Sequence, residues 1–227
     1  MKLIKLLAFH LLSFAVVVAL PLQAAVPVLK EPRHIVKFAN KYVRVIDASI
    51  PVGDATLYHT HSIDNVPVAV SGGQLKTQLI GKEATFSTVA TGTVSYARET
   101  YTHQITNVGN THVRFIDAEV LASPGNGTNI PPPLEHVTGT TLEIDNERVR
   151  VYRVILEPGQ STGIHTHKLS RLSVIVSKGK VAIESPKQKI RTVDFNPGNY
   201  RWQDGETTHA IKNIGTSRFE MVDIEWK

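Results

Sequence analysis

Residues 53–61 read GDATLYHTH, and residues 159–167 read GQSTGIHTH. Both stretches place a glycine, then five residues, ahead of two histidines that are separated by one residue. Side chains at positions i and i+2 of an extended strand point to the same face, so His59 and His61 share a face, as do His165 and His167. The two stretches therefore predict a pair of neighbouring imidazoles on one strand, present twice in the chain.

The interval between these stretches recurs along the chain. The motif NKYVRV at 40–45 is answered by NERVRV at 146–151, and His103 by His209, each time 106 residues later. Asn107, Gly109 and the IDAE of 116–119 keep the same offset to Asn213, Gly215 and the VDIE of 222–225. Because the offset never changes, no insertion or deletion separates the copies, and the chain is predicted to contain two similar domains.

Each repeat is predicted to be built of short strands. Residues 42–50 and 148–156 are rich in β-branched residues with polar positions interleaved at a period of two, and glycine or proline turns follow at short intervals. We therefore predict an all-β fold of two barrels or sandwiches, with domains at 26–122 and 134–227. A proline- and glycine-rich linker is predicted at 123–133.

The N-terminus is typical of a secretory signal peptide at residues 1–24. Lys2 and Lys5 precede a short apolar run, and Ala24 and Ala25 suit a cleavage site. The run is short for a bilayer span, so we expect no stable membrane insertion after cleavage. The chain has no cysteine, and a disulfide-free exported protein suits a bacterial periplasm, so a periplasmic or secreted location is expected.

Charge excludes one class of partner. The formal net charge of +5 includes the two lysines of the predicted leader, and no block of consecutive basic residues follows. Nucleic-acid binding is therefore not expected.

A third histidine in each repeat completes a candidate metal site. His103 and His209 each lie 42 residues beyond the second histidine of their pair. If these faces point into a barrel, three imidazoles converge, and one divalent cation satisfies their ring nitrogens together. His34, His112 and His136 fall outside the repeat, and we expect them to be surface or hydrogen-bonding residues.

These motifs resemble those of the cupin superfamily, specifically of a two-domain bicupin. The first family motif is matched by Gly53, His59, His61 and Gly72 or Gly73, and again by Gly159, His165, His167 and Gly179. The second is matched by Gly92, His103 and Asn107, and again by Pro197, Gly198, His209 and Asn213. The resemblance covers nearly all of the chain after the leader. It implies two tandem double-stranded β-helix (jelly-roll) barrels, with metal ligands His59, His61, His103, His165, His167 and His209.

The chain departs from the family pattern at one position in each repeat. Where the pattern has a metal-binding glutamate, the chain has Asn65 and Arg171. Three neutral imidazoles leave a bound divalent ion with its full positive charge, so an additional cation beside it favours the binding of an anion. A guanidinium can hold a carboxylate through two hydrogen bonds. We therefore expect Arg171 and Asn65 to bind a small anionic ligand.

The resemblance implies an exported metal-binding bicupin, and the leading hypothesis is a three-histidine oxygenase acting on a small organic acid or carbonyl compound. A non-catalytic periplasmic protein that binds a ligand or metal is the alternative, and a metal-free remnant that serves assembly is the third. Imidazole ligands do not distinguish Fe, Zn, Mn, Cu or Ni, although the missing carboxylate argues against the manganese chemistry of oxalate decarboxylases. No residue is identified as catalytic. Because cupins often pair through edge strands, a homodimer is one expected state.

Overall fold

The computed structural model describes residues 24–98, 100–124 and 130–227. The predicted signal peptide, 1–24, lies outside the described residues except for its last position, and the predicted linker, 123–133, is described only at its two ends. Within the described part of the chain, no helix has the length and apolar character needed to cross a membrane.

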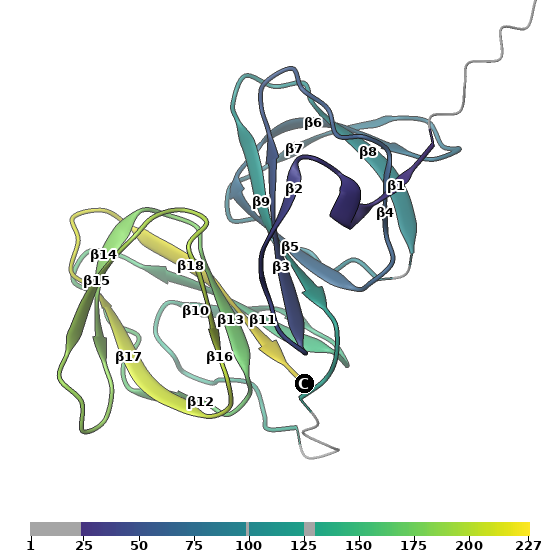
Figure 1. Ribbon diagram of the computed structural model, residues 1–227. Helices are drawn as coiled ribbons and strands as arrows, with labels where there is room; N and C mark the ends of the chain where they lie inside the picture. The colour runs from purple at the N-terminus through teal and green to yellow at the C-terminus, as the bar shows by residue number, and fades with distance from the viewer. Residues whose placement is uncertain (1–23, 99, 125–129) are drawn as a thin grey trace, which may run out of the picture.

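The first half of the chain forms a jelly-roll barrel of two facing sheets (Figure 1). One sheet has the strand order β2-β3-β9-β5, and the other has the order β1-β4-β8-β6-β7. A short 3-10 turn, η1 (Val28–Lys30), joins the first two strands. The strands are β1 (Val26–Pro27), β2 (His34–Ala39), β3 (Val43–Ile50), β4 (His59–His61), β5 (Asn65–Ser71), β6 (Gly73–Leu79), β7 (Thr85–Val89), β8 (Tyr101–Asn107) and β9 (Val113–Val120).

The second half repeats this architecture. Its sheets have the orders β10-β11-β18-β13-β16 and β12-β17-β14-β15. The strands are β10 (Thr140–Asp145), β11 (Val149–Leu156), β12 (His165–His167), β13 (Arg171–Ile175), β14 (Gly179–Glu184), β15 (Arg191–Phe195), β16 (Tyr200–Gln203), β17 (Thr207–Asn213) and β18 (Phe219–Trp226). The predicted all-β class with two jelly-roll barrels is thus confirmed.

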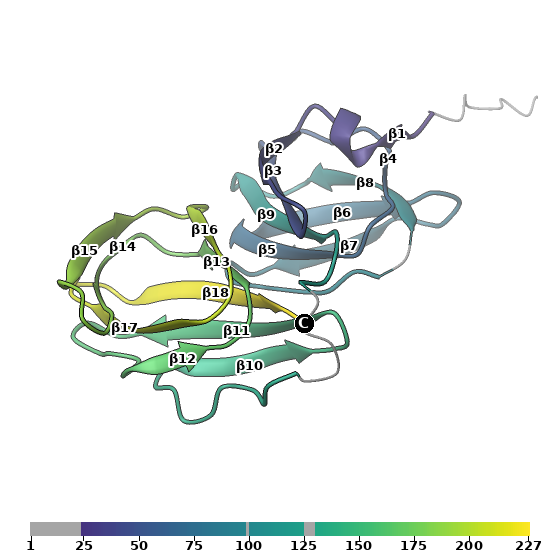
Figure 2. The same ribbon diagram turned by 60° about the horizontal axis from the view of Figure 1, so that its bottom comes forward.

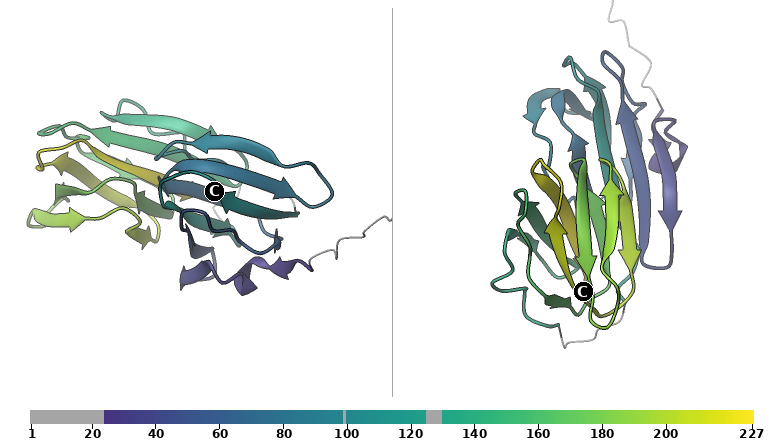
Figure 3. Two further views of the ribbon diagram at one scale, coloured as in Figure 1. Left: turned by 90° about the horizontal axis from the view of Figure 1, so that it is seen from above. Right: turned by 90° about the vertical axis from the view of Figure 1, so that its left-hand side faces the viewer.

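The largest apolar core lies between the two barrels. Along β3, Val43 and Val45 point toward the other barrel, whereas Ala48 and Ile50 line the interior of their own, as the alternation of strand side chains requires. The sheets that contain β3 and β11 therefore face each other, and Figures 2 and 3 show the two barrels in contact along them. The fully buried members of this core include Val43, Val45, Val66, Val68, Ile116, Ala118, Val149, Val151, Leu172, Val174, Val222, Ile224 and Trp226.

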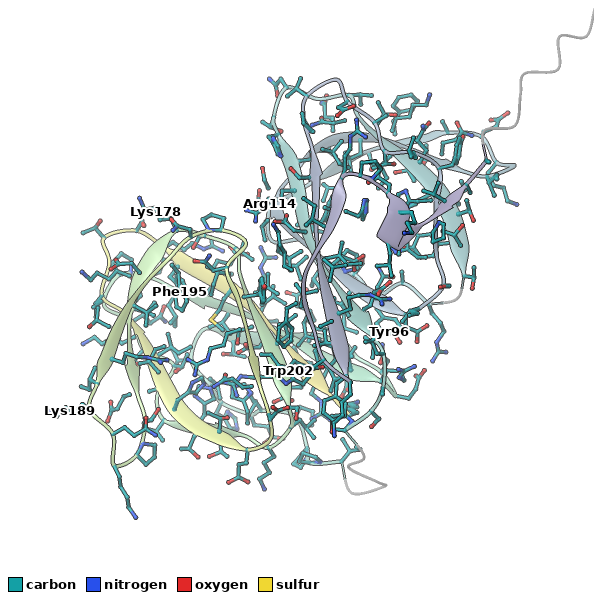
Figure 4. All side chains as sticks on the ribbon, viewed as in Figure 1. Tyr96, Arg114, Lys178, Lys189, Phe195 and Trp202 are labelled. Carbon is teal, nitrogen blue, oxygen red and sulfur yellow. The ribbon has the colours of Figure 1, made fainter. Side chains whose placement is uncertain are left out.

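The contacts between the barrels come in pairs related by the repeat. Trp226 Nε1 donates to the Tyr42 carbonyl at 3.2 Å, and Arg148 Nη2 donates to the Val120 carbonyl at 2.9 Å. Arg148 is the repeat equivalent of Tyr42, and Val120 is the equivalent of Trp226. Reciprocal contacts of this kind are the pattern of a two-fold symmetric dimer. Figure 4 shows Trp202 at the same junction, where its ring stacks 6.1 Å from that of Tyr42.

Charged residues at the rim of this junction follow the same reciprocity. Arg98 forms an ion pair with Glu147. The equivalents of these two residues, Asp204 and Lys41, also interact, since the pKa of Lys41 is raised chiefly by Tyr42 and additionally by Asp204. Both basic residues belong to the first barrel, and both acidic residues belong to the second.

Candidate metal centres

Strand pairing brings the three histidines of each repeat together. β4 pairs antiparallel with β8 so that His59 lies directly opposite His103, which places their Cβ atoms about 5 Å apart. His61 shares the face of His59 because the two are separated by one residue. The pairing of β12 with β17 gives the equivalent residues of the second repeat the same arrangement.

The N-terminal centre contains four histidines. His103 Nε2 lies 3.0 Å from His59 Nε2, and the ring centroids of His61 lie 5.0 Å from His59 and 5.3 Å from His103. The fourth ring is that of His34 at the start of β2, with its centroid 4.6 Å from His59. One nitrogen from each of His34, His59 and His61 lies within 4.8 Å of the others.

The C-terminal centre contains three histidines. Ligand nitrogens of His165, His167 and His209 all lie within 4.8 Å of one another, and Nε2 of His165 lies 3.1 Å from Nε2 of His167. Thr140 occupies the repeat position of His34. The two centres therefore differ by one imidazole.

Hydrogen bonds to Nδ1 leave Nε2 lone pairs directed into the centres. His59 Nδ1 donates to the Leu57 carbonyl at 2.9 Å, and His165 Nδ1 donates to the Gly163 carbonyl at 2.9 Å. His167 Nδ1 lies 2.8 Å from the Glu225 carboxylate. Histidines that bind metals usually have their second nitrogen held in this way.

The histidines fit a bound cation in two further respects. His209 Nε2 is buried without a hydrogen-bond partner, a situation that costs about 1–3 kcal/mol unless a ligand satisfies the atom. Two nitrogens bound about 2.1 Å from one ion at a right angle lie about 3.0 Å apart. The Nε2 separations of 3.0 Å and 3.1 Å in the two centres agree with that geometry.

Four of the histidines have a pKa well below physiological pH. Burial, supplemented by neighbouring rings, lowers the pKa of His59 to about 4, that of His61 to about 3 and that of His103 to about 2. Burial and then Arg171 lower the pKa of His209 to about 3. A metal binds the neutral imidazole, so the environment keeps these rings in the form that a ligand requires.

The three histidines outside the repeat are exposed or hydrogen-bonded, as expected, but the position of His34 at the N-terminal centre was not predicted. His112 and His136 are exposed, as predicted. His34 does form a hydrogen bond, with Glu31, but its side chain is 6% exposed and its ring faces the N-terminal centre. The repeat could not reveal it, because its equivalent is Thr140.

Asn65 and Arg171 occupy equivalent places opposite the histidines but have different partners. The Asn65 amide donates to both carboxylate oxygens of Asp117 at 2.8 Å. Arg171 is 1% exposed, and within the described part of the chain its Nε and Nη1 have no hydrogen-bond partner; the Asp223 carboxylate lies 3.8 Å from Nε. Asn65 is therefore hydrogen-bonded within the fold, whereas Arg171 retains unused donors.

The charge of Arg171 affects the pKa of the neighbouring aspartate, as a comparison of the equivalent residues Asp117 and Asp223 shows. Burial raises the pKa of Asp117 to about 6. Burial acts in the same direction on Asp223, but Arg171, followed by His167, lowers the pKa of Asp223 overall. The C-terminal centre therefore contains a buried cation that the N-terminal centre lacks.

Asp64 does not replace the missing carboxylate ligand. Its carboxylate accepts from the Tyr96 hydroxyl at 2.5 Å and lies 3.5 Å from Arg148, which places it at the junction of the barrels. Tyr96 and its repeat equivalent, Trp202, pack against the core between the barrels.

A pocket of about 350 Å³ opens beside the C-terminal centre and contains Arg171 and His209 in its wall. Further out it is lined by exposed basic residues and by apolar residues of β14 and β15. Figure 4 shows Lys189 and Phe195 on this side of the barrel. The N-terminal centre adjoins a smaller pocket of about 140 Å³.

Comparisons with known proteins identify the fold. No protein-family model and no curated protein sequence matches the chain at a significant level. Among solved structures, AerE from Microcystis aeruginosa is 12% identical with a TM-score of 0.58, and the alignment covers 87% of this chain and 98% of that one. Oxalate decarboxylase from Bacillus subtilis, an enzyme with Mn(II) centres, is 13% identical with a TM-score of 0.57, covering 82% of this chain and 69% of its own.

A cupin domain from Bordetella pertussis Tohama I aligns with a shorter part of the chain. It is 31% identical with a TM-score of 0.37, and the alignment covers 39% of this chain and 91% of that domain. The two longer matches span both barrels of this chain, and at their level of identity they report on the fold.

Proposed function

The chain has the bicupin fold of the cupin superfamily, and we propose that it is a metal-dependent oxygenase that binds a small organic acid at its C-terminal centre. In this proposal His165, His167 and His209 hold a divalent transition metal, and His59, His61 and His103 hold one in the first barrel. The metal remains one of Fe, Zn, Mn, Cu or Ni. Histidine donors alone favour none of these.

The observation that carries the proposal is that two guanidinium nitrogens of Arg171 lack hydrogen-bond partners among the described residues, although Asp223 lies 3.8 Å away. A guanidinium that is 1% exposed and has two nitrogens without partners is costly unless an anion completes its hydrogen bonds. It lines the same pocket as His209. A carboxylate held by Arg171 would therefore lie beside the metal ligands.

The pocket also suggests the kind of acid. Four of its lining side chains are basic, namely Arg171, Lys189, Arg191 and Arg201, and among the described residues none of the lining side chains is acidic. The remaining wall includes Ile183, Phe195 and Met221. This combination favours an organic acid with an apolar portion, because a ligand as small as oxalate would leave the apolar wall uncovered.

The protein's own groups would bind and orient the acid. Arg171 would fix the carboxylate by charge-assisted hydrogen bonds, the apolar wall would position the remainder, and the three histidines would keep the metal in place. A transition metal bound there supplies Lewis-acid polarisation and, for iron, manganese or copper, redox chemistry. Export to the periplasm or outside the cell belongs to the proposal, supported by the leader-like N-terminus and the absence of cysteine.

The test begins with the metal. Protein purified without an affinity tag is analysed for transition metals, then depleted and reloaded with each in turn. Binding of carboxylic acids of increasing apolar length is measured by calorimetry, with the amide of each acid as the matched neutral control. Oxygen consumption is then followed with the acids that bind.

We expect metal at the histidine centres, binding of the acid but not of its amide, and oxygen uptake with the iron-loaded protein. Acid binding without oxygen uptake under any metal would establish the non-catalytic ligand-binding alternative instead. A protein that takes up no transition metal would overturn the proposal.

A further inference from the structure

Glu31 and His34 form a buried pair that exists in the first barrel only. The Glu31 carboxylate is fully buried and lies 2.7 Å from His34 Nδ1. In the second barrel the equivalent positions are Val137 and Thr140. The pair is therefore a feature of one repeat and not of the fold that both repeats share.

The environment of Glu31 determines which nitrogen of His34 is free. The carboxylate also accepts the backbone N–H of Arg33 at 2.6 Å and that of Leu57 at 3.1 Å. Since the carboxylate acts as an acceptor throughout, His34 Nδ1 donates to it, and Nε2 is the nitrogen left to face the centre. A carboxylate that holds the far nitrogen of a histidine is the usual outer partner of a metal ligand.

We propose that His34 is a fourth imidazole ligand of the N-terminal metal centre, with Glu31 as its positioning residue. This inference rests on the proposed metal binding and extends it. Its basis is the 4.6 Å centroid distance to His59, the grouping of nitrogens from His34, His59 and His61 within 4.8 Å, and the place of His34 in the wall of the N-terminal pocket.

A fourth imidazole would give the two centres different tasks. At the N-terminal centre it would occupy a position that would otherwise admit water or a ligand. The adjoining pocket is only about 140 Å³, and the described residues that line it include no lysine or arginine. The C-terminal centre keeps three histidines and Arg171. We therefore assign tighter metal retention to the first centre and binding of the organic acid to the second.

The test uses the full chain with the C-terminal centre disabled by His165→Ala and His209→Ala, so that only the N-terminal centre binds. In this background His34→Thr copies the residue that the second barrel has at the equivalent position. His112→Thr is the matched control, since His112 is exposed and its ring forms a hydrogen bond with Ser49, away from the metal centre. Co²⁺ affinity is measured by competition with a chelator, and the nitrogen couplings of bound Cu²⁺ are measured by electron paramagnetic resonance.

We expect His34→Thr to weaken Co²⁺ binding at least about tenfold and to remove one nitrogen coupling, while His112→Thr changes neither. Glu31→Gln should weaken binding less and retain the coupling. Equal affinity and unchanged couplings in His34→Thr would overturn the inference.

A second measurement needs no substitution, should His34→Thr fail to fold. Long-range ¹H–¹⁵N spectra of the native chain are recorded with and without Zn²⁺, and the His34 Nε2 resonance should shift together with that of His59. If His59 shifts and His34 does not, His34 is not a ligand and the metal site itself stands. If no histidine responds to any metal, the proposed function fails as a whole.

Discussion

Arg171→Asn is the most informative single change, because the first barrel already has an asparagine at the equivalent position. Asn65 stands at the equivalent position of the first barrel and donates to both oxygens of Asp117 at 2.8 Å. An asparagine at 171 can reach Asp223 in the same way. The substitution thus removes the buried cation while leaving the neighbouring aspartate with a hydrogen-bond donor.

The magnitude follows from what Arg171 offers a ligand. Hydrogen bonds between ionised partners contribute about 1.5–3 kcal/mol, so losing the guanidinium should raise the dissociation constant of the bound acid by roughly 10- to 150-fold. Stability should change little, because the two partnerless nitrogens of Arg171 disappear and Asp223 gains the amide. The pKa of Asp223, now held down by Arg171, should rise as that of Asp117 does.

Calorimetric titration of the metal-loaded protein with the acid and with its amide measures the effect. Arg201→Asn provides the control, because Arg201 lies in the same pocket but is exposed, where a charge contributes far less. We expect the acid to lose its advantage over the amide in Arg171→Asn only. Acid affinity within twofold of the native protein would refute the assignment of Arg171 as the anion-binding residue.

Three further predictions concern the fold. In acid, the metal-free protein should lose stability as the pH falls below 6.5, because the unfolded chain protonates four imidazoles whose pKa is lowered to about 4 or less in the native state, namely those of His59, His61, His103 and His209. His165, whose pKa is also lowered, adds to this loss, and Glu119, whose pKa is raised, opposes it. Asp117, whose pKa is raised to about 6, acts in the opposite sense. The unfolded chain therefore binds about three more protons than the native state, and the free energy of unfolding should change near pH 5 by on the order of 4 kcal/mol per pH unit. Denaturant midpoints that do not change between pH 7.5 and 5 would contradict this. Gly198→Ala should destabilise the protein more than Gly159→Ala. Both glycines have φ +82°, but a Cβ at Gly198 would lie 2.6 Å from the Arg114 guanidinium, whereas a Cβ at Gly159 would meet no described atom within 4 Å. Equal melting temperatures of the two variants would show that the contact with Arg114 is irrelevant. Trp226→Ala should cost about 3–5 kcal/mol in one cooperative transition, because Trp226 is fully buried between the barrels, and a calorimetric trace that resolves two transitions would argue against a shared core.

Much of the architecture could be predicted from the repeat alone. A fixed offset of 106 residues pairs β2 to β9 of the first barrel with strands of the second, although β1, η1 and β16 have no copy among the described elements. The period-two alternation of a strand places His59 and His61 on one face without any knowledge of the barrel. The position of His34 at the metal centre could not be predicted in this way. His34 has no copy in the second repeat, so the repeat did not mark it as a ligand, and its distance from His59 depends on how β2 lies across the barrel from β4.

The position of the apolar core between the barrels could not be predicted from the sequence either. The alternation in 42–50 predicts that one face of the strand is buried, but it does not say what covers that face. In the structure the valine face of β3 meets the other barrel, and the opposite face lines the cavity with the histidines. Which of the two faces turns inward is decided by closure of the barrel and by the partner domain, neither of which is encoded locally.

The reciprocal junction suggests why the halves could diverge. A duplicated gene whose product once paired with itself becomes, after fusion, a tethered heterodimer that never dissociates. Lys41 and Arg98 on one side now oppose Asp204 and Glu147 on the other, so two identical first halves would repel each other where unlike halves attract. Once each half had a permanent partner of different sequence, a mutation in one cavity no longer had to be compatible with the function of both cavities.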